Sequence, residues 1–238
     1  MGVSGGVAMM GLVLALARPP AGSLALTIDI TALMPMSNAE FRTMVDETGA
    51  LWTSHGVVFT WITTATAASD PLPQGAVRVV RDGCRVVPLC PPAGTAGASR
   101  RAFPGPLGAV VFHEGSTTPD NTLLLSVDAV VEAVERVKWQ NRNLADLPTD
   151  TRGYLIGRAL GRVLAHEIGH YLLAWRVHTR DGLMRPEFRA DQLIALSRKG
   201  FRLSETQVPS LRLRLARLAD RPRELARNRD SSPSQPEP

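Results

Sequence analysis

Residues 149–175 constrain the fold of this chain most strongly, because they form one long helical pattern. An α-helix turns by about 100° per residue, so regularly spaced apolar residues align as one stripe that predicts a buried face. The stripe consists of Ile156, Ala159, Leu160 and Val163. The same geometry places Arg158 and Arg162 on the opposite face. A helix with an apolar face must pack against a second layer of structure.

The same helical count brings polar side chains onto the buried stripe. Glu167 and His170 fall on it, and His166 lies beside it, one turn before His170. Buried imidazoles and carboxylates need partners, because desolvated polar groups are costly when unpaired. Histidines at positions i and i+4 present their ring nitrogens to a common point that tetrahedral Zn2+ accepts, and Glu167 then points towards the water. A hydrogen-bonded structural role for the two histidines is the alternative.

A catalytic zinc site needs three protein ligands and one open position. His178 is the candidate for the third ligand, which requires the helix to end near Trp175 and the chain to fold back beneath the metal. An exposed loop position is the alternative for His178. Asp181 and Glu187 are the competing ligands, although Asp181 also suits a turn before Gly182 and Glu187 suits the start of a helix.

The rest of the chain predicts a sheet followed by helices. Strand patterns occupy residues 23–30, 57–63, 75–80, 107–115 and 122–127, and helical patterns occupy residues 39–56 and the segment from Asp128. Ser37 and Asn38 provide a helix N-cap, and Gly56 closes that helix. This order predicts an α/β (α+β) fold, in which a mixed twisted sheet packs on the long helix. Helical patterns at residues 189–200 and 210–227 predict a small, mostly helical C-terminal subdomain.

We expect one domain over residues 26–228, divided into subdomains 26–175 and 176–228. Residues 1–25 contain an apolar run at 7–17, which is typical of a signal peptide and too short for a stable membrane span. A secreted or periplasmic protein follows from this interpretation, with an uncleaved anchor or an apolar N-terminus as the alternative. Residues 229–238 have the composition of a disordered tail.

The charge distribution bears on possible binding partners, and the cysteine content bears on disulfides and on zinc binding. The net charge of +5 derives largely from arginines in residues 199–229, without interleaved aromatics, so we expect a solvated basic helix and no nucleic-acid partner. A basic helical partner-binding protein is the rival interpretation. Cys84 and Cys90 suit either a small disulfide loop in an exported protein or two buried thiols. No CxxC pair exists, so a cysteine zinc cluster is excluded.

The segment "HEIGHYLLAWRVHTRDGLM", residues 166–184, resembles the metzincin zinc metallopeptidases, in particular the bacterial metzincin-like proteins. Their pattern is HExxH, seven residues, a histidine, and then a turn of glycine, a hydrophobic residue and methionine. The resemblance implies that Glu167 is the general base, that Met184 forms the turn below the metal, and that Gly182 permits this turn. It also implies three zinc ligands, His166, His170 and His178.

This chain departs from the commoner metzincin spacing at two positions. Leu173 and Arg176 stand where that spacing has glycine and the third histidine, and arginine cannot ligate zinc. Ala174 and Trp175 would then make the bend that brings His178 back to the metal.

The sequence therefore predicts a zinc-dependent peptidase that acts on a peptide or protein substrate. Zn2+ would activate a water molecule, and Glu167 would take its proton and pass it to the leaving amine. Residues 107–116 are the strand expected to bind extended substrate by strand addition, with His113 and Glu114 at its end. A non-catalytic, zinc-stabilised binding module is the alternative, although such sites usually fill all four positions with protein ligands. No pattern in the chain indicates its oligomeric state.

Overall fold

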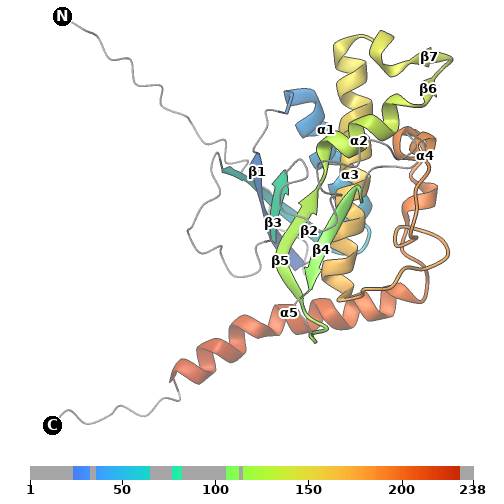
Figure 1. Ribbon diagram of the computed structural model, residues 1–238. Coiled ribbons are helices and arrows are strands. Elements are labelled where there is room, and N and C mark those ends of the chain that lie inside the picture. The colour runs from blue at the N-terminus through green and yellow to red at the C-terminus, as the bar shows by residue number, and fades with distance from the viewer. Residues whose placement is uncertain (1–23, 33–35, 65–76, 82–105, 113–114, 231–238) are drawn as a thin grey trace, which may run out of the picture.

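The computed structural model describes residues 24–32, 36–64, 77–81, 106–112 and 115–230, and it shows a mixed sheet packed against helices (Figure 1). The main sheet within these residues contains β1 (Leu24–Ala32), β2 (Val57–Thr64), β3 (Val77–Arg81), β4 (Gly108–Phe112) and β5 (Pro119–Leu125). Their order is β2-β1-β3-β5-β4. All neighbours pair in parallel except β4, which runs antiparallel to β5. The antiparallel strand β4 therefore lies at one edge of the sheet.

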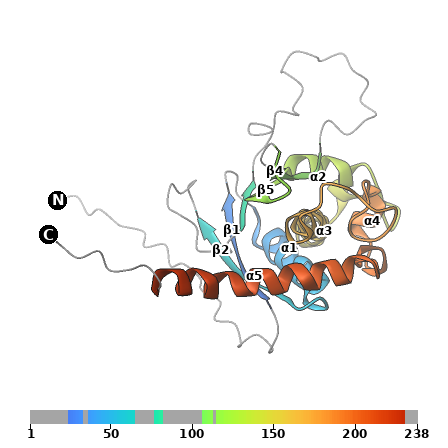
Figure 2. The same cartoon turned by 90° about the horizontal axis from the view of Figure 1, so that it is seen from below.

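The helices follow the expected order. They are α1 (Asn38–Thr53), α2 (Val127–Glu135), α3 (Thr149–Leu173), α4 (Ala190–Ile194) and α5 (Gln207–Asp230), with short 3-10 turns η1 (Leu144–Asp146) and η2 (Lys199–Phe201). A small ribbon of β6 (Lys138–Trp139) and β7 (Arg142–Asn143) precedes η1. Figure 2 shows α1 and α3 together on one side of the sheet, with α4 beyond α3. The α+β class expected from the sequence is therefore present, and α3 lies between the sheet layer and the C-terminal segment.

The start of α1 confirms the N-cap prediction. Ser37 Oγ accepts a hydrogen bond from the Glu40 backbone N–H at 3.2 Å, and the Glu40 carboxylate accepts one from the Ser37 N–H at 2.8 Å. This reciprocal pair satisfies two backbone donors that the helix itself leaves open. Gly56 has φ +76°, a left-handed conformation that glycine adopts readily, and it joins α1 to β2 as predicted.

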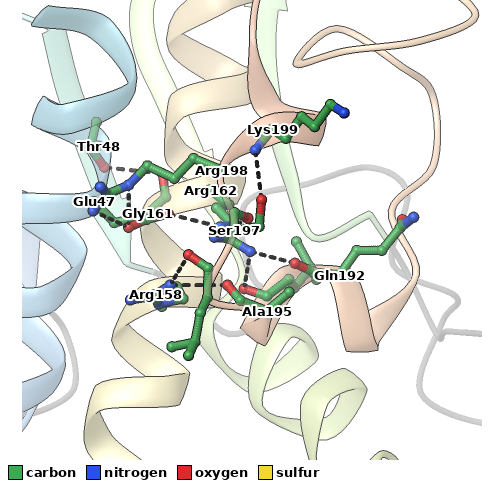
Figure 3. Close-up of polar contacts among 12 residues, drawn as sticks. Glu47, Thr48, Arg158, Gly161, Arg162, Gln192, Ala195, Ser197, Arg198 and Lys199 are labelled. Carbon is green, nitrogen blue, oxygen red and sulfur yellow. Dashed lines mark hydrogen bonds and ion pairs between the residues drawn. The ribbon is translucent and has the colours of Figure 1, made fainter.

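The packing of α3 corrects the prediction of a polar face opposite its apolar stripe. Every residue from Leu155 to Leu173 is buried, including Arg158 and Arg162. Arg162 forms an ion pair with Glu47 of α1, and Arg158 donates to backbone carbonyls that follow α4 (Figure 3). The C-terminal segment therefore covers the side of α3 that the periodicity had assigned to the opposite face.

The helix predicted over residues 189–200 is shorter than its pattern. Helix α4 ends at Ile194, and Ala195 is extended with ψ 147°. The carbonyls of Ala195 and Leu196 accept hydrogen bonds from Arg158 Nη1, at 3.0 Å each. Because these carbonyls bind a buried guanidinium, they do not continue the helical ladder.

Helix α5 passes beneath the C-terminal end of α3 and then projects away from the other elements (Figures 1 and 2). Within the described part of the chain, no helix combines the length and hydropathy needed to cross a bilayer. The predicted features at residues 1–23 and 231–238, Cys84, Cys90, His113 and Glu114 all lie outside the described residues.

Candidate metal centre

The end of α3 turns the chain back at the two residues expected to form the bend. Ala174 adopts the left-handed conformation, with φ 53° and ψ 40°. The N–H groups of Ala174 and Trp175 donate to the carbonyls of Tyr171 at 3.4 Å and His170 at 3.3 Å. A left-handed C-cap is a common helix ending that satisfies terminal carbonyls. It returns the chain towards the helix before His178.

This return brings three histidines together. The ligand atoms of His166, His170 and His178 all lie within 4.8 Å of one another. His170 Nε2 is 3.0 Å from His166 Nε2 and 3.2 Å from His178 Nε2. The two helical histidines are buried, whereas His178 is exposed on the loop. The three Nε2 atoms therefore converge at one point above α3.

Backbone carbonyls determine which ring nitrogens are available at that point. His166 Nδ1 lies 2.6 Å from the Leu183 carbonyl oxygen, and His170 Nδ1 lies 2.6 Å from that of Trp175. A carbonyl only accepts, so in the neutral rings Nδ1 carries the proton and Nε2 presents its lone pair. Lone pairs so close together need a shared cation. The donor set therefore fits a zinc ion, which is bound by neutral imidazoles.

Burial keeps these imidazoles neutral. It lowers the pKa of His166 from its ordinary value to about 4, against the opposing hydrogen bond to Leu183. Burial also lowers the pKa of His170. Since only neutral histidine ligates a metal, both shifts favour the ligand form.

Glu167 lies beside the cluster, under the backbone of β4. The side chain is 5% exposed, and burial raises its pKa to about 8. A Cβ placed on Gly108 would come within 2.7 Å of Glu167 Cγ and Oε1. The absence of a side chain at Gly108 therefore creates the space that Glu167 occupies.

Met184 packs against α3 at Gly169. It is fully buried, and a Cβ on Gly169 would overlap its Sδ atom. The Met184 carbonyl accepts from the Thr179 N–H at 2.8 Å, while Gly182 has φ +82° and lies against the Arg202 carbonyl. The glycine and the methionine therefore lie in a tight turn next to α3.

The histidine cluster opens into a cavity of about 720 Å³. Its wall includes β4 residues, the three histidines, Glu167 and the segment at Pro186, Glu187 and Phe188. Arg176 lies at this wall, with its guanidinium 4.6 Å from the Phe112 ring centroid and Nη2 donating to the Ser116 carbonyl at 2.7 Å. The cleft is thus bounded by an edge strand on one side and the post-helix segment on the other.

The alternative third ligands lie apart from this cluster. Among the described residues, the metal-competent group contains His166, His170 and His178, without Asp181 or Glu187. Asp181 is exposed beside Gly182, and Glu187 lines the cavity. The sequence interpretation missed Gly108 and Phe188, because their roles come from contacts with residues far away in the chain. The sequence does contain a signal for close packing against α3. Glycines recur on that helix at helical spacing, at Gly153, Gly157, Gly161 and Gly169.

Comparison with known proteins gives a limited result. No protein-family model matches this sequence, and no curated protein matches it. The chain is similar to the crystal structure of archaemetzincin from Methanopyrus kandleri, with a TM-score of 0.47 and 12% identity, covering 84% of this chain and 99% of that one. At that degree of likeness, the case for function rests on the residues of the site.

Proposed function

We propose that this chain is a metzincin-like, zinc-dependent peptidase that hydrolyses peptide bonds with Glu167 as general base. One observation carries the proposal: three Nε2 atoms converge next to a buried carboxylate on the wall of an open cleft. His166, His170 and His178 would hold Zn2+ and leave one coordination position for water or substrate. When bound there, Zn2+ supplies Lewis acidity that polarises a carbonyl and lowers the pKa of water.

Glu167 performs the proton transfers in this proposal. Its carboxylate accepts a proton from the attacking water and then donates it to the nitrogen of the leaving amine. For both transfers the Glu167 carboxylate must lie within hydrogen-bond reach of the water and then of the amine nitrogen. Contact with Gly108 limits where this carboxylate can move. The buried histidines keep Nδ1 on carbonyl oxygens throughout, so they act as fixed ligands.

Strand β4 is the proposed binding surface for the substrate backbone. It pairs with β5 on one side, and its residues Gly108, Ala109, Val110 and Phe112 line the cavity. An extended peptide can add to such an edge through main-chain hydrogen bonds. Peptides and proteins are therefore the proposed substrates.

A purely structural zinc site would ordinarily have four protein ligands. Within the described residues the cluster offers three, and a cavity lies beside them. Glu167 is also buried in the wall of this cavity, and a purely structural zinc site would have no need of such a carboxylate. These features favour catalysis over a zinc-stabilised binding module.

Zinc content and cleavage of a mixed peptide pool test the proposal directly. We expect one zinc per chain in the wild-type protein, weakened retention in His178→Ala, and full retention without cleavage in Glu167→Gln. His55→Gln is the matched control, because His55 lies at the end of α1, away from the cluster. It should keep both zinc and activity.

Two results contradict the proposal in different ways. A wild-type protein that takes up no zinc from a stoichiometric solution removes the metal site. A zinc-loaded Glu167→Gln variant that cleaves peptides as fast as wild type removes Glu167 from the mechanism.

A further inference from the structure

Two arginines on α3 hold the chain that returns after the metal ligands. Arg162 donates to the carbonyls of Gln192, Leu193 and Ser197, and Arg158 donates to those of Ala195 and Leu196 (Figure 3). These arginines stand four residues apart, and His166 and His170 continue the same four-residue steps. Residues at this spacing are neighbours on one side of a helix. One row of α3 side chains therefore binds backbone carbonyls all along the returning chain.

The cation of Arg162 is neutralised inside the protein. Its side chain is 0% exposed, and Nε donates to Glu47 Oε1 at 2.8 Å. Arg198 reaches the other carboxylate oxygen of Glu47, also at 2.8 Å, but its side chain is 46% exposed. A buried charge is tolerated when it is paired and its donors are satisfied. The position of the Arg162 guanidinium is accordingly determined from several directions at once.

Aromatic rings connect this guanidinium to a metal ligand. Arg162 lies 4.3 Å from the Phe201 ring centroid, and Phe201 stacks on Phe188 at 5.0 Å with an interplanar angle of 14°. The Phe188 and His166 ring centroids are 5.5 Å apart, with an interplanar angle of 89°. Phe188 is also part of the cavity wall. A continuous series of ring contacts therefore runs from Arg162 through Phe201 and Phe188 to His166.

A second connection reaches His166 through the backbone. The Leu183 N–H donates to the Arg202 carbonyl at 2.9 Å, directly after η2. The carbonyl of the same residue, Leu183, accepts from His166 Nδ1 at 2.6 Å. The segment around Phe201 and Arg202 therefore supports both the ring and the carbonyl that contact His166.

We propose that Arg162 is a positioning residue for His166, acting through Phe201 and the Leu183 backbone. The role of His166 as metal ligand rests on the proposed function, but its orientation by Arg162 is a property of the protein without metal. Groups that hydrogen-bond directly to a ligating side chain typically change metal affinity by about 10- to 100-fold when removed. Arg162 acts on one such group, the Leu183 carbonyl that accepts from His166 Nδ1. Arg162 stands four residues before His166 on α3 and is not a member of the histidine cluster.

The test compares Arg162→Met with Arg198→Met in the full chain. Long-range 1H–15N spectra of the metal-free protein report whether His166 keeps a single Nδ1–H tautomer, and chelator competition reports the zinc dissociation constant. Arg162→Met leaves Glu47 paired with Arg198, so the carboxylate is not stranded. We expect mixed tautomers at His166 and a zinc dissociation constant raised about 10-fold or more. Arg198→Met should leave the His166 tautomer and the zinc dissociation constant unchanged. The Arg198 side chain contacts Glu47 and neither Phe201 nor the backbone carbonyls that Arg162 binds.

A folded Arg162→Met protein with the wild-type His166 tautomer and unchanged zinc affinity overturns the proposal. If that variant does not fold, Phe201→Leu preserves the Glu47 ion pair and removes the aromatic link, and an unchanged His166 tautomer in that variant overturns the part of the proposal that runs through Phe201. If the wild-type protein takes up no zinc, the proposed function fails while the tautomer comparison still decides the positioning role.

Discussion

Each of the two helical histidines uses one ring nitrogen for a hydrogen bond to the backbone and leaves the other free for the proposed metal. Nδ1 of His166 and of His170 binds a carbonyl of the returning chain, which leaves Nε2 directed at the cluster. Glu167 differs, because its position depends on a missing side chain at Gly108. At the scale of single residues, the site is therefore oriented by backbone atoms of β4 and of the post-helix turn.

Gly108→Ala should displace Glu167 without touching the histidines. The added Cβ would lie within 2.7 Å of the Glu167 carboxylate group, so this flexible side chain must shift. We expect zinc content to stay at the wild-type level while kcat falls by about 10-fold or more, as for a misplaced catalytic group. Steady-state kinetics and metal analysis of the same preparation measure both quantities.

Gly49→Ala is the matched control, since a Cβ at Gly49 meets no atom within 4 Å. Equal kcat in Gly108→Ala and Gly49→Ala would show that contact with Gly108 does not position the carboxylate.

Ala174→Gly should stabilise the protein. Ala174 is held in the left-handed conformation, which costs a residue with a Cβ about 1–2 kcal/mol and glycine almost nothing. After the extra chain entropy of glycine, we expect a gain of about 1 kcal/mol, or a rise in Tm of about 2–4 °C. Thermal unfolding measures it.

Ala50→Gly is the control and should lower the stability of the protein. Ala50 is exposed inside α1, where glycine costs about 1 kcal/mol. A lower Tm in both variants would mean that the strain at Ala174 is absent.

Helices α1 and α3 approach closely because glycines line their contact. A Cβ on Gly157 would overlap the Glu40 carbonyl oxygen, and one on Gly161 would come within 2.7 Å of the Met44 carbonyl oxygen. The close approach also lets Trp52 Nε1 donate to the Ala165 carbonyl at 3.1 Å. At the scale of elements, α1 therefore packs by direct backbone contact against α3, the helix that carries His166 and His170.

Gly157→Ala should destabilise the fold although alanine is the better helix former. The gain of about 1 kcal/mol in helix propensity is outweighed by overpacking of about 1–3 kcal/mol against a rigid carbonyl. Gly153→Ala is the comparison, because its nearest neighbour is the Ala39 Cβ at 3.2 Å. In urea unfolding, Gly157→Ala should have a lower free energy of unfolding than Gly153→Ala. The reverse order would contradict close backbone packing between α1 and α3.

The cluster of three histidines joins two parts of the molecule. His166 and His170 belong to α3, whereas His178 belongs to the chain that returns after Ala174. A ligand that binds only the folded protein stabilises it by an amount set by its concentration and affinity. At the scale of the whole molecule, zinc would therefore tie the post-helix segment to the central helix.

Removal of zinc should lower the Tm of the wild-type protein, and its return should restore it. At a free zinc concentration 1,000 times the dissociation constant, the linkage is about 4 kcal/mol, or roughly 8–16 °C for a chain of this size. Differential scanning calorimetry before and after chelation measures this shift. His178→Ala should lose most of it and Glu167→Gln should keep it, so an equal shift in all three proteins would exclude His178 as a ligand.

Local sequence patterns were sufficient to predict many of the helices and strands. Helical periodicity predicted α1 and α3, a cap marked the start of α1, short runs rich in apolar and β-branched residues predicted the strands, and the spacing of the histidines placed them near one another. These features depend on neighbours within a few residues, which the sequence displays directly. The bend at Ala174 and Trp175 followed from the distance that His178 must return.

Contacts between distant residues decided the rest. Arg162 resembles a surface residue in the periodicity of α3, yet it is buried because Glu47, 115 residues away, neutralises it. Gly108 lies against Glu167 only because β4 pairs antiparallel at the edge of the sheet. The tertiary structure alone determines such pairs, since the free energy of burying a charge or removing a side chain depends on partners that no local pattern identifies.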